Sequence, residues 1–162
     1  MNYILYDGTV RNALLPFTFT RPVADIRVGI LTIREKWERY LGNTTTTVTE
    51  EYLADKYPMV EMDENIMINA SFCPNEVLVE MISFLQPFQA IVKNNEIIAF
   101  YTTSDQDEVD FDSYELIEIE EDCLQIEHSW DIFQKNDQAI REDFEFITHE
   151  RNHSLYRIPF RF

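Results

Sequence analysis

Arginine side chains gather near the start of this 162-residue sequence. The first 43 residues carry six Lys or Arg against four Asp or Glu, whereas the rest of the chain carries seven against twenty-six. A guanidinium group binds phosphate oxygens in a planar, bidentate geometry, and a chain that is otherwise anionic repels phosphate elsewhere. The sequence therefore predicts that a phosphate-bearing ligand binds near the early arginines. These are Arg11, Arg21, Arg27 and Arg34.

Arg21 is the strongest candidate for the main cationic, catalytic contact. It precedes Pro22, which favours an extended backbone, and the hydroxyl groups of Thr18 and Thr20 are placed to share its ligand. Arg11 and Arg27 have two interpretations, because each either binds phosphate or pairs with a nearby carboxylate. Backbone N–H groups near Gly8 and near the start of the helix that follows this segment are further candidate donors to an anion.

The elements that position these residues are those of an α/β protein. Asn2–Tyr6 is rich in strand-forming residues and ends at Asp7-Gly8, a turn signal. Residues 7–29 lack a helical period and predict one long ordered loop, which in a compact domain is usually functional. Apolar residues at helical spacing then predict a helix from Ile30 to Leu41, closed by Gly42.

Strand and helix signals continue to alternate after this helix. We expect strands at Thr44–Thr49 and Ile66–Ile68, a hairpin over 89–102 that turns at Asn94-Asn95, and a strand over Tyr114–Ile119. The expected helices are a short one over Glu50–Lys56, one that Pro74 opens and Pro87 closes, and a C-terminal one with an apolar face of Ala139, Ile140, Phe144 and Ile147. The pattern predicts one domain over residues 1–162.

Composition excludes several classes of partner. A net charge of −17 and a pI near 4.4 argue against nucleic acid or an anionic membrane surface as a partner. We find no signal peptide and no run long enough to cross a bilayer, and we expect a cytoplasmic protein. Cys73 and Cys123 stand alone and predict buried thiols.

A second motif points to different chemistry. The run His149-Glu150-Arg151-Asn152-His153 matches the H-E-x-x-H pattern of zinc peptidases. The nine residues after His153 contain no His, Asp, Glu or Cys that would complete the zinc ligands, so we interpret the match as a chance polar helix end. A zinc-content assay on the purified protein separates the two interpretations.

The run from Leu15 to Trp37 resembles the start of a family of sugar nucleotidyltransferases related to the uridylyltransferase domain of bacterial acetylglucosamine-1-phosphate uridylyltransferase. Asn65–Ser71 and Glu127–Phe133 resemble later landmarks of that family, so the similarity covers most of the chain. The resemblance implies a Rossmann-like mixed sheet flanked by helices, in a truncated or shortened form. It also implies transfer of a nucleoside monophosphate from a nucleoside triphosphate to a sugar 1-phosphate, with Mg²⁺ as cofactor and release of pyrophosphate.

Matching the family's motifs residue by residue shows departures. The phosphate-binding loop of the type G-x-G-T-R corresponds to Tyr6–Arg11, which implies Asp7, Gly8 and Thr9 as contacts. The family's lysine is missing, and Arg21 is the nearest cation, although a guanidinium and an ammonium place phosphate oxygens differently. The family's magnesium-binding Asp falls near Asn69-Ala70, so the metal ligands are unknown, with Asp7 or Asp131 as substitutes. By the same match Asn69 is a candidate contact to the substrate or its phosphate.

These departures leave two functions open. The first is a working nucleotidyltransferase. The second is a non-catalytic domain that binds a nucleotide or sugar phosphate, or regulates an acyltransferase-like partner, because relatives with this opening resemble two-part proteins with a hexapeptide-repeat second half. A hexapeptide-repeat domain or a second copy of the chain is therefore an expected partner.

Overall fold

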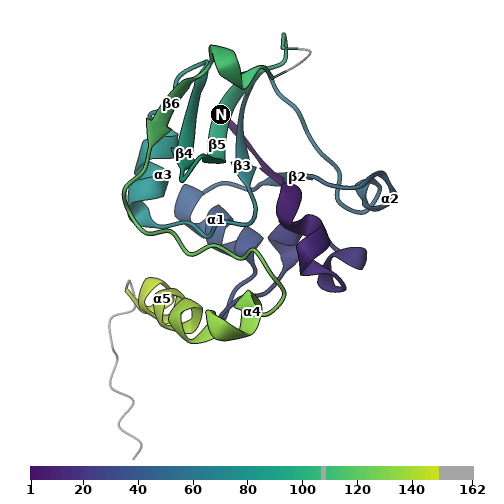
Figure 1. Ribbon diagram of the computed structural model, residues 1–162, viewed down its shortest axis with the longest axis vertical. Coiled ribbons are helices and arrows are strands. Elements are labelled where there is room, and N and C mark those ends of the chain that lie inside the picture. Colours follow the sequence, from purple (N-terminus) through teal and green to yellow (C-terminus); the bar gives the residue numbers. More distant parts are fainter. Residues whose placement is uncertain (107–108, 150–162) are drawn as a thin grey trace, which may run out of the picture.

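A computed structural model describes residues 1–106 and 109–149 and contains a six-stranded mixed sheet with helices (Figure 1). The strand order is β2-β1-β3-β5-β4-β6. β1 (Asn2–Tyr6) lies between β2 (Thr46–Val48) and β3 (Glu64–Asn69) and runs parallel to both. The carboxyl ends of these three strands therefore meet at one edge of the sheet. The predicted α/β class is confirmed.

The other half of the sheet is a hairpin with one added strand. β4 (Gln89–Lys93) and β5 (Glu96–Thr103) are antiparallel, and β5 pairs with β3. The residues between them, Asn94 and Asn95, have φ angles of 50° and 65°, the left-handed conformation that asparagine tolerates. This hairpin was predicted and is confirmed. β6 (Glu115–Glu118) adds to β4 in parallel.

The main core lies between the sheet and helices α1 (Ile33–Leu41) and α3 (Glu76–Ser83). Trp37 of α1 is fully buried and its indole N–H donates to the carbonyl of Phe72. α1 begins three residues later than the apolar spacing predicts. The reason is a capping box, in which Thr32 accepts from the N–H of Glu35 while Glu35 accepts from the N–H of Thr32.

The predicted loop between β1 and α1 is ordered by three short turns of 3₁₀ helix. These are η1 (Thr9–Leu14), η2 (Phe17–Phe19) and η3 (Val23–Asp25). Their apolar residues Leu14, Val23 and Ala24 are fully buried in the main core. The loop is therefore anchored by its own side chains, which holds its polar residues in fixed positions.

The remaining helices are α2 (Glu51–Ala54), α4 (Asp131–Gln134) and α5 (Asn136–Thr148). Figure 1 shows α4 and α5 side by side at the lower end of the molecule. The apolar face predicted for the last helix is wrong, because Ile140 and Phe144 are 41% and 58% exposed while Ala139 and Asp143 are buried. Within the described residues, no helix combines the length and apolarity needed to span a bilayer.

Candidate functional site

A cavity of about 300 Å³ lies at the carboxyl ends of β1 and β2. The strand order changes direction here, because the chain passes from β2 to the opposite side of β1 to form β3. Such points in α/β sheets are where ligands bind. We call this cavity the crevice. It is lined by Tyr6, Asp7, Gly8, Arg11, Val48, Thr49, Glu50 and Glu51.

Gly8 makes the turn out of β1 possible. Its φ of +63° is a conformation that other L-residues rarely adopt, and a Cβ atom would lie 3.1 Å from Oδ1 of Asn69. Asn69 in turn accepts a hydrogen bond from the N–H of Ser71 at 3.0 Å and donates to the carbonyl of Ile97 at 3.3 Å. Asn69 therefore connects the ends of β3 and β5 behind Gly8. Thr9 follows as an exposed residue.

Arg11 is buried in the crevice wall and surrounded by oxygen atoms. Its guanidinium donates to Oδ2 of Asp7 at 2.6 Å, to the carbonyl of Thr18 at 2.6 Å and to the phenol of Tyr52 at 2.9 Å. Thr49 Oγ1 lies at 3.3 Å and Glu50 Oε1 at 3.6 Å. The carboxylate-pairing interpretation of Arg11 is thus the one that the structure shows.

Asp7 is the carboxylate that organises this wall. Oδ1 accepts from the backbone N–H of Val23 at 2.7 Å, and Oδ2 accepts from Arg11 and from the hydroxyl of Thr49, each at 2.6 Å. These bonds connect the end of β1 to η1, η3 and the residue after β2. Three of the roughly four lone-pair sites of the Asp7 carboxylate are therefore already occupied within the protein.

Thr18 has a structural position that the sequence did not reveal. The side chain is fully buried, and its hydroxyl donates to the backbone carbonyl of Arg11 at 2.8 Å while the Thr18 carbonyl accepts from the Arg11 guanidinium. The prediction that its hydroxyl contacts a ligand requires solvent access, which this geometry does not provide.

Arg21 and Thr20 are exposed, and Arg21 forms no ion pair among the described residues. Two residues before Arg21, the carbonyl of Phe19 accepts a hydrogen bond at 3.0 Å from Tyr52, the same phenol that binds Arg11. Arg21 does not line the crevice, but its segment is connected through Tyr52 to Arg11 of the crevice wall. Its role as a cationic contact stays a prediction.

The other two early arginines are paired within the protein. Arg27 donates to the carbonyl of Ile30 and lies 3.8 Å from Glu35, and Arg34 donates to Asp25 at 2.8 Å. Three of the four early arginines therefore lie against carboxylates, and for Arg11 and Arg27 this is the carboxylate-pairing interpretation. For Asp7, Asp25 and Glu35 the reason is local, because each lies within nine residues of its arginine, whereas Glu50 lies 39 residues from Arg11.

The N–H groups before α1 do meet an anion, but the anion belongs to the protein. Ile30 and Leu31 donate to Oδ2 of Asp143 at 2.8 and 3.1 Å, and the buried Lys36 pairs with the other oxygen of Asp143. Gly29 donates to Asn136 at 2.9 Å. The predicted anion contact at this point is thus filled by α5. In the sequence, this contact could have been suspected only from Asp143, which lies four residues after Ala139 and therefore on the same face of the helix.

Both carboxylates suggested as substitute magnesium ligands, Asp7 and Asp131, already accept hydrogen bonds within the protein. Asp131 accepts from the N–H groups of Glu127 and His128, each at 2.9 Å, and lies 3.5 Å from Lys135. Asp7 is satisfied as described above. Across residues 1–106 and 109–149, no group of three or more His, Cys, Asp or Glu is placed to hold a metal ion. Of the H-E-x-x-H motif, all but His149 lies outside the described residues.

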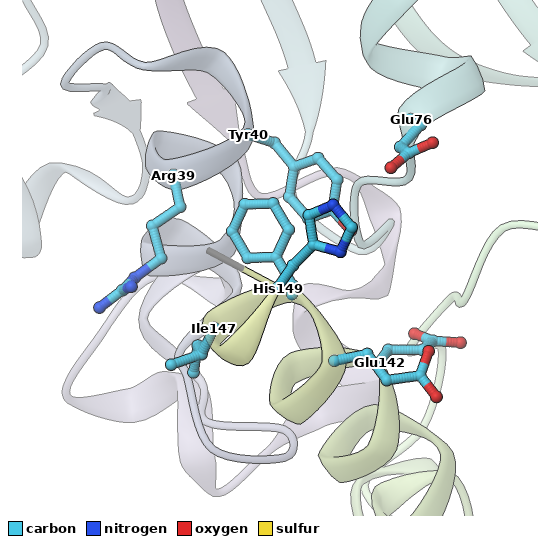
Figure 2. Close-up of a pocket in the computed structure, with 8 residues that line it drawn as sticks. Arg39, Tyr40, Glu76, Glu142, Ile147 and His149 are labelled. Carbon is cyan, nitrogen blue, oxygen red and sulfur yellow. The ribbon is translucent and has the colours of Figure 1, made fainter. Parts of the chain in front are cut away.

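A larger cavity, of about 550 Å³, lies elsewhere, between α1, the start of α3 and α5 (Figure 2). Its walls carry Glu76, Glu142 and Glu145 together with the stacked rings of Tyr40 and Phe146, whose centroids are 4.2 Å apart. None of the residues predicted to bind phosphate lines it. The acidic walls make it a poor receptor for phosphate.

Cys73 is buried as predicted, whereas Cys123 is half-buried. Burial raises the pKa of the Cys73 thiol to about 12, so this sulfur stays protonated at neutral pH and is not a nucleophile.

A sequence model of one protein family, described as sugar nucleotidyl transferase, matches residues 3–152. The chain belongs to the sugar nucleotidyl transferase family. The match includes the crevice and the whole loop from Asp7 to Gly29. No curated protein sequence matches this chain.

The family's fold is also found among solved structures. The chain is similar to a structure described as "a Putative Glucose-1-Phosphate Thymidylyltransferase from Bacillus anthracis in Complex with a Sucrose", with a TM-score of 0.51 and 11% identity. The similarity covers 86% of this chain and 95% of that one. At this identity the comparison establishes a shared fold. This structural similarity supports the predicted nucleotidyltransferase-type sheet independently of the family match.

Proposed function

We propose that this domain binds a nucleoside triphosphate and a sugar 1-phosphate at the crevice and transfers a nucleoside monophosphate between them, releasing pyrophosphate. The observation that supports this most is the position of the crevice, at the point where the strand order reverses in a member of the sugar nucleotidyl transferase family. Transfer of this kind depends chiefly on in-line placement of two phosphate groups and on cations that stabilise the charge of the leaving pyrophosphate.

Arg21 is the residue to which we assign that cationic contact. It is exposed, lacks an ion pair among the described residues and follows the segment that Tyr52 fastens to the crevice. A guanidinium without an internal carboxylate is available to a phosphate, whereas Arg11, Arg27 and Arg34 each lie against one.

Mg²⁺ is the cofactor that the family resemblance implies, and it supplies positive charge to bound phosphates. The described residues do not fit a protein-held magnesium site, because Asp7 and Asp131 already accept several hydrogen bonds within the fold. A metal ion held by this chain's own residues therefore takes no part in the proposed transfer.

A second candidate function is binding without turnover, as a nucleotide- or sugar-phosphate-binding or regulatory domain beside an acyltransferase-like partner. It is favoured by the mutual neutralisation of Asp7 and Arg11, which leaves the crevice wall without an unpaired buried charge. The missing family lysine favours it as well.

One experiment addresses both candidates. Thermal shift with nucleoside triphosphates and sugar 1-phosphates should raise the melting temperature of the wild type, because a ligand at 100 times its Kd adds about 2.7 kcal/mol to the free energy of unfolding. Arg21→Ala should lose most of the shift, and Arg39→Ala, which removes an exposed arginine outside the crevice, should keep it.

A pyrophosphate-release assay on the same samples then separates the two functions. Release that depends on both substrates supports the transferase, and ligand shifts without release support the binding domain. If millimolar ligands leave the melting temperature of the wild type unchanged, both proposals are wrong.

A further inference from the structure

The oxygen atoms around Arg11 form a set that a metal ion would also accept. They are two carboxylates, a backbone carbonyl and two hydroxyl groups, contributed by Asp7, Glu50, Thr18, Thr49 and Tyr52. Hard divalent cations such as Mg²⁺ and Ca²⁺ bind oxygen ligands of these kinds. We call this set the oxygen cage. The atom group at its centre is the guanidinium of Arg11.

The cage is built from segments far apart in the sequence. Asp7 follows β1, Thr18 belongs to η2, and Thr49 to Tyr52 run from the end of β2 into α2. Arg11 therefore holds three parts of the crevice wall together. A bound metal ion performs the same task in many proteins, by drawing oxygen ligands from separate loops to one point.

Burial makes the pairing of charges in the cage obligatory. The side chains of Arg11 and Asp7 are only 9% and 7% exposed, and their charged atoms are 2.6 Å apart. A buried carboxylate without a cation is strongly unfavourable. The guanidinium is covalently attached, so it cannot leave the cage as a metal ion can.

We propose that Arg11 is the resident cation of the crevice: it occupies the place beside Asp7 and Glu50 that a divalent ion would take, and the wild-type crevice binds no Mg²⁺ of its own. A corollary, which rests on the proposed function, is that phosphate ligands bind at the crevice without a metal held by the protein. In this chain a side chain, rather than a metal ion, then holds the parts of the crevice wall together.

The test uses metal ions alone, so it does not depend on nucleotide binding. Arg11→Met removes the guanidinium and keeps an unbranched side chain, leaving Asp7 and Glu50 with no cation between them. With 10 mM MgCl₂ or CaCl₂, compared with KCl of equal ionic strength, we expect the melting temperature of this variant to rise by about 3 °C or more. The wild type should show no such difference.

Two variants control for non-specific binding of cations to an acidic protein. Arg141→Met makes the same change in net charge and also removes a guanidinium from a carboxylate, the exposed Asp137, outside the crevice. It should show no specific response to the divalent ion. In the double variant Asp7→Asn with Arg11→Met, the response gained by the single variant should disappear.

A separate measurement covers the case in which Arg11→Met fails to fold. Calorimetric titration of the wild type with Mg²⁺ and Mn²⁺ should detect no saturable site. A one-to-one site that Asp7→Asn abolishes would overturn the proposal, and so would a folded Arg11→Met protein that gains no more from divalent ions than Arg141→Met.

Discussion

At the scale of single residues, Asp131 shows how a buried carboxylate fixes a turn. Two backbone N–H groups, from Glu127 and His128, point at its Oδ2 atom, and Lys135 lies close to Oδ1. Burial by itself would raise the pKa of this carboxyl group, but the two N–H groups and the Lys135 charge outweigh burial, so the pKa lies below its ordinary value of 3.8. The fold therefore stabilises the ionised form.

We expect Asp131→Asn to lower the free energy of unfolding at neutral pH by about 1–3 kcal/mol, because the amide accepts weaker hydrogen bonds and carries no charge opposite Lys135. A pKa that is lowered in the folded state gives stability that is present above the unfolded value and is lost as the pH falls through the folded value. The difference between wild type and variant should therefore shrink as the pH falls below about 4. Urea denaturation at several pH values measures it, and a pH-independent difference would contradict the assignment.

At the scale of elements, α5 is attached to the body of the protein by the charge of Asp143 together with two apolar contacts, the buried Ala139 and the ring of Phe146 stacked on Tyr40. Asp143 reaches the backbone N–H groups of Ile30 and Leu31 and the ammonium of Lys36. Gly29 permits this approach, because its φ is +80° and a Cβ atom would lie 2.6 Å from Asp143 Oδ2. The exposed Ile140 and Phe144 contribute little to this attachment.

Removal of Asp143 should release α5. We expect Asp143→Ala to lower the free energy of unfolding by about 3–5 kcal/mol, because it leaves Lys36 buried without a partner. The matched control is Asp137→Ala on the same helix, whose side chain is 81% exposed and pairs with an exposed Arg141. That change should stay within about 0.5 kcal/mol.

Urea denaturation measures both variants, and hydrogen exchange at the amides of Ile30 and Leu31 locates the effect. Faster exchange at these amides is expected in Asp143→Ala alone. Equal losses of stability in the two variants would show that Asp143 has no special part in attaching the helix.

At the scale of the whole molecule, a net charge of −17 opposes the compact state. The described ion pairs relieve this repulsion at a few places, such as the pairs of Asp7, Asp25 and Asp143, and leave most carboxylates without a cation. Mobile ions in solution must then screen the remainder.

We expect the melting temperature at pH 7 to rise as NaCl is increased from about 20 to about 500 mM, because the Debye length falls to a few ångströms. The dependence on salt should become much smaller near the pI of about 4.4, where the net charge vanishes. Scanning calorimetry at both pH values measures the two slopes. Equal slopes would show that self-repulsion does not limit stability.

The sequence alone determined much of the fold, because local signals decide local structure. The Asn94-Asn95 turn tolerates positive φ, Gly42 ends α1 in the left-handed conformation, and the strand-forming run at Asn2–Tyr6 became β1, an interior strand of the sheet. The capping residue Thr32 is also a local signal, and it places the start of α1 at Ile33, whereas the apolar spacing alone predicts Ile30. Similarity over residues 3–152 assigns the family from sequence as well.

The tertiary structure decided which charges meet. The sequence showed an excess of arginines near its start, but the pairing of Arg11 with Glu50, 39 residues away, depends on how the start of α2 approaches η1. Asp143 lies 107 residues from Lys36 and fills a position that the backbone N–H groups before α1 had predicted for a ligand. Coulomb attraction and the cost of burying an unpaired charge act through distance in space, which separation along the chain does not reveal.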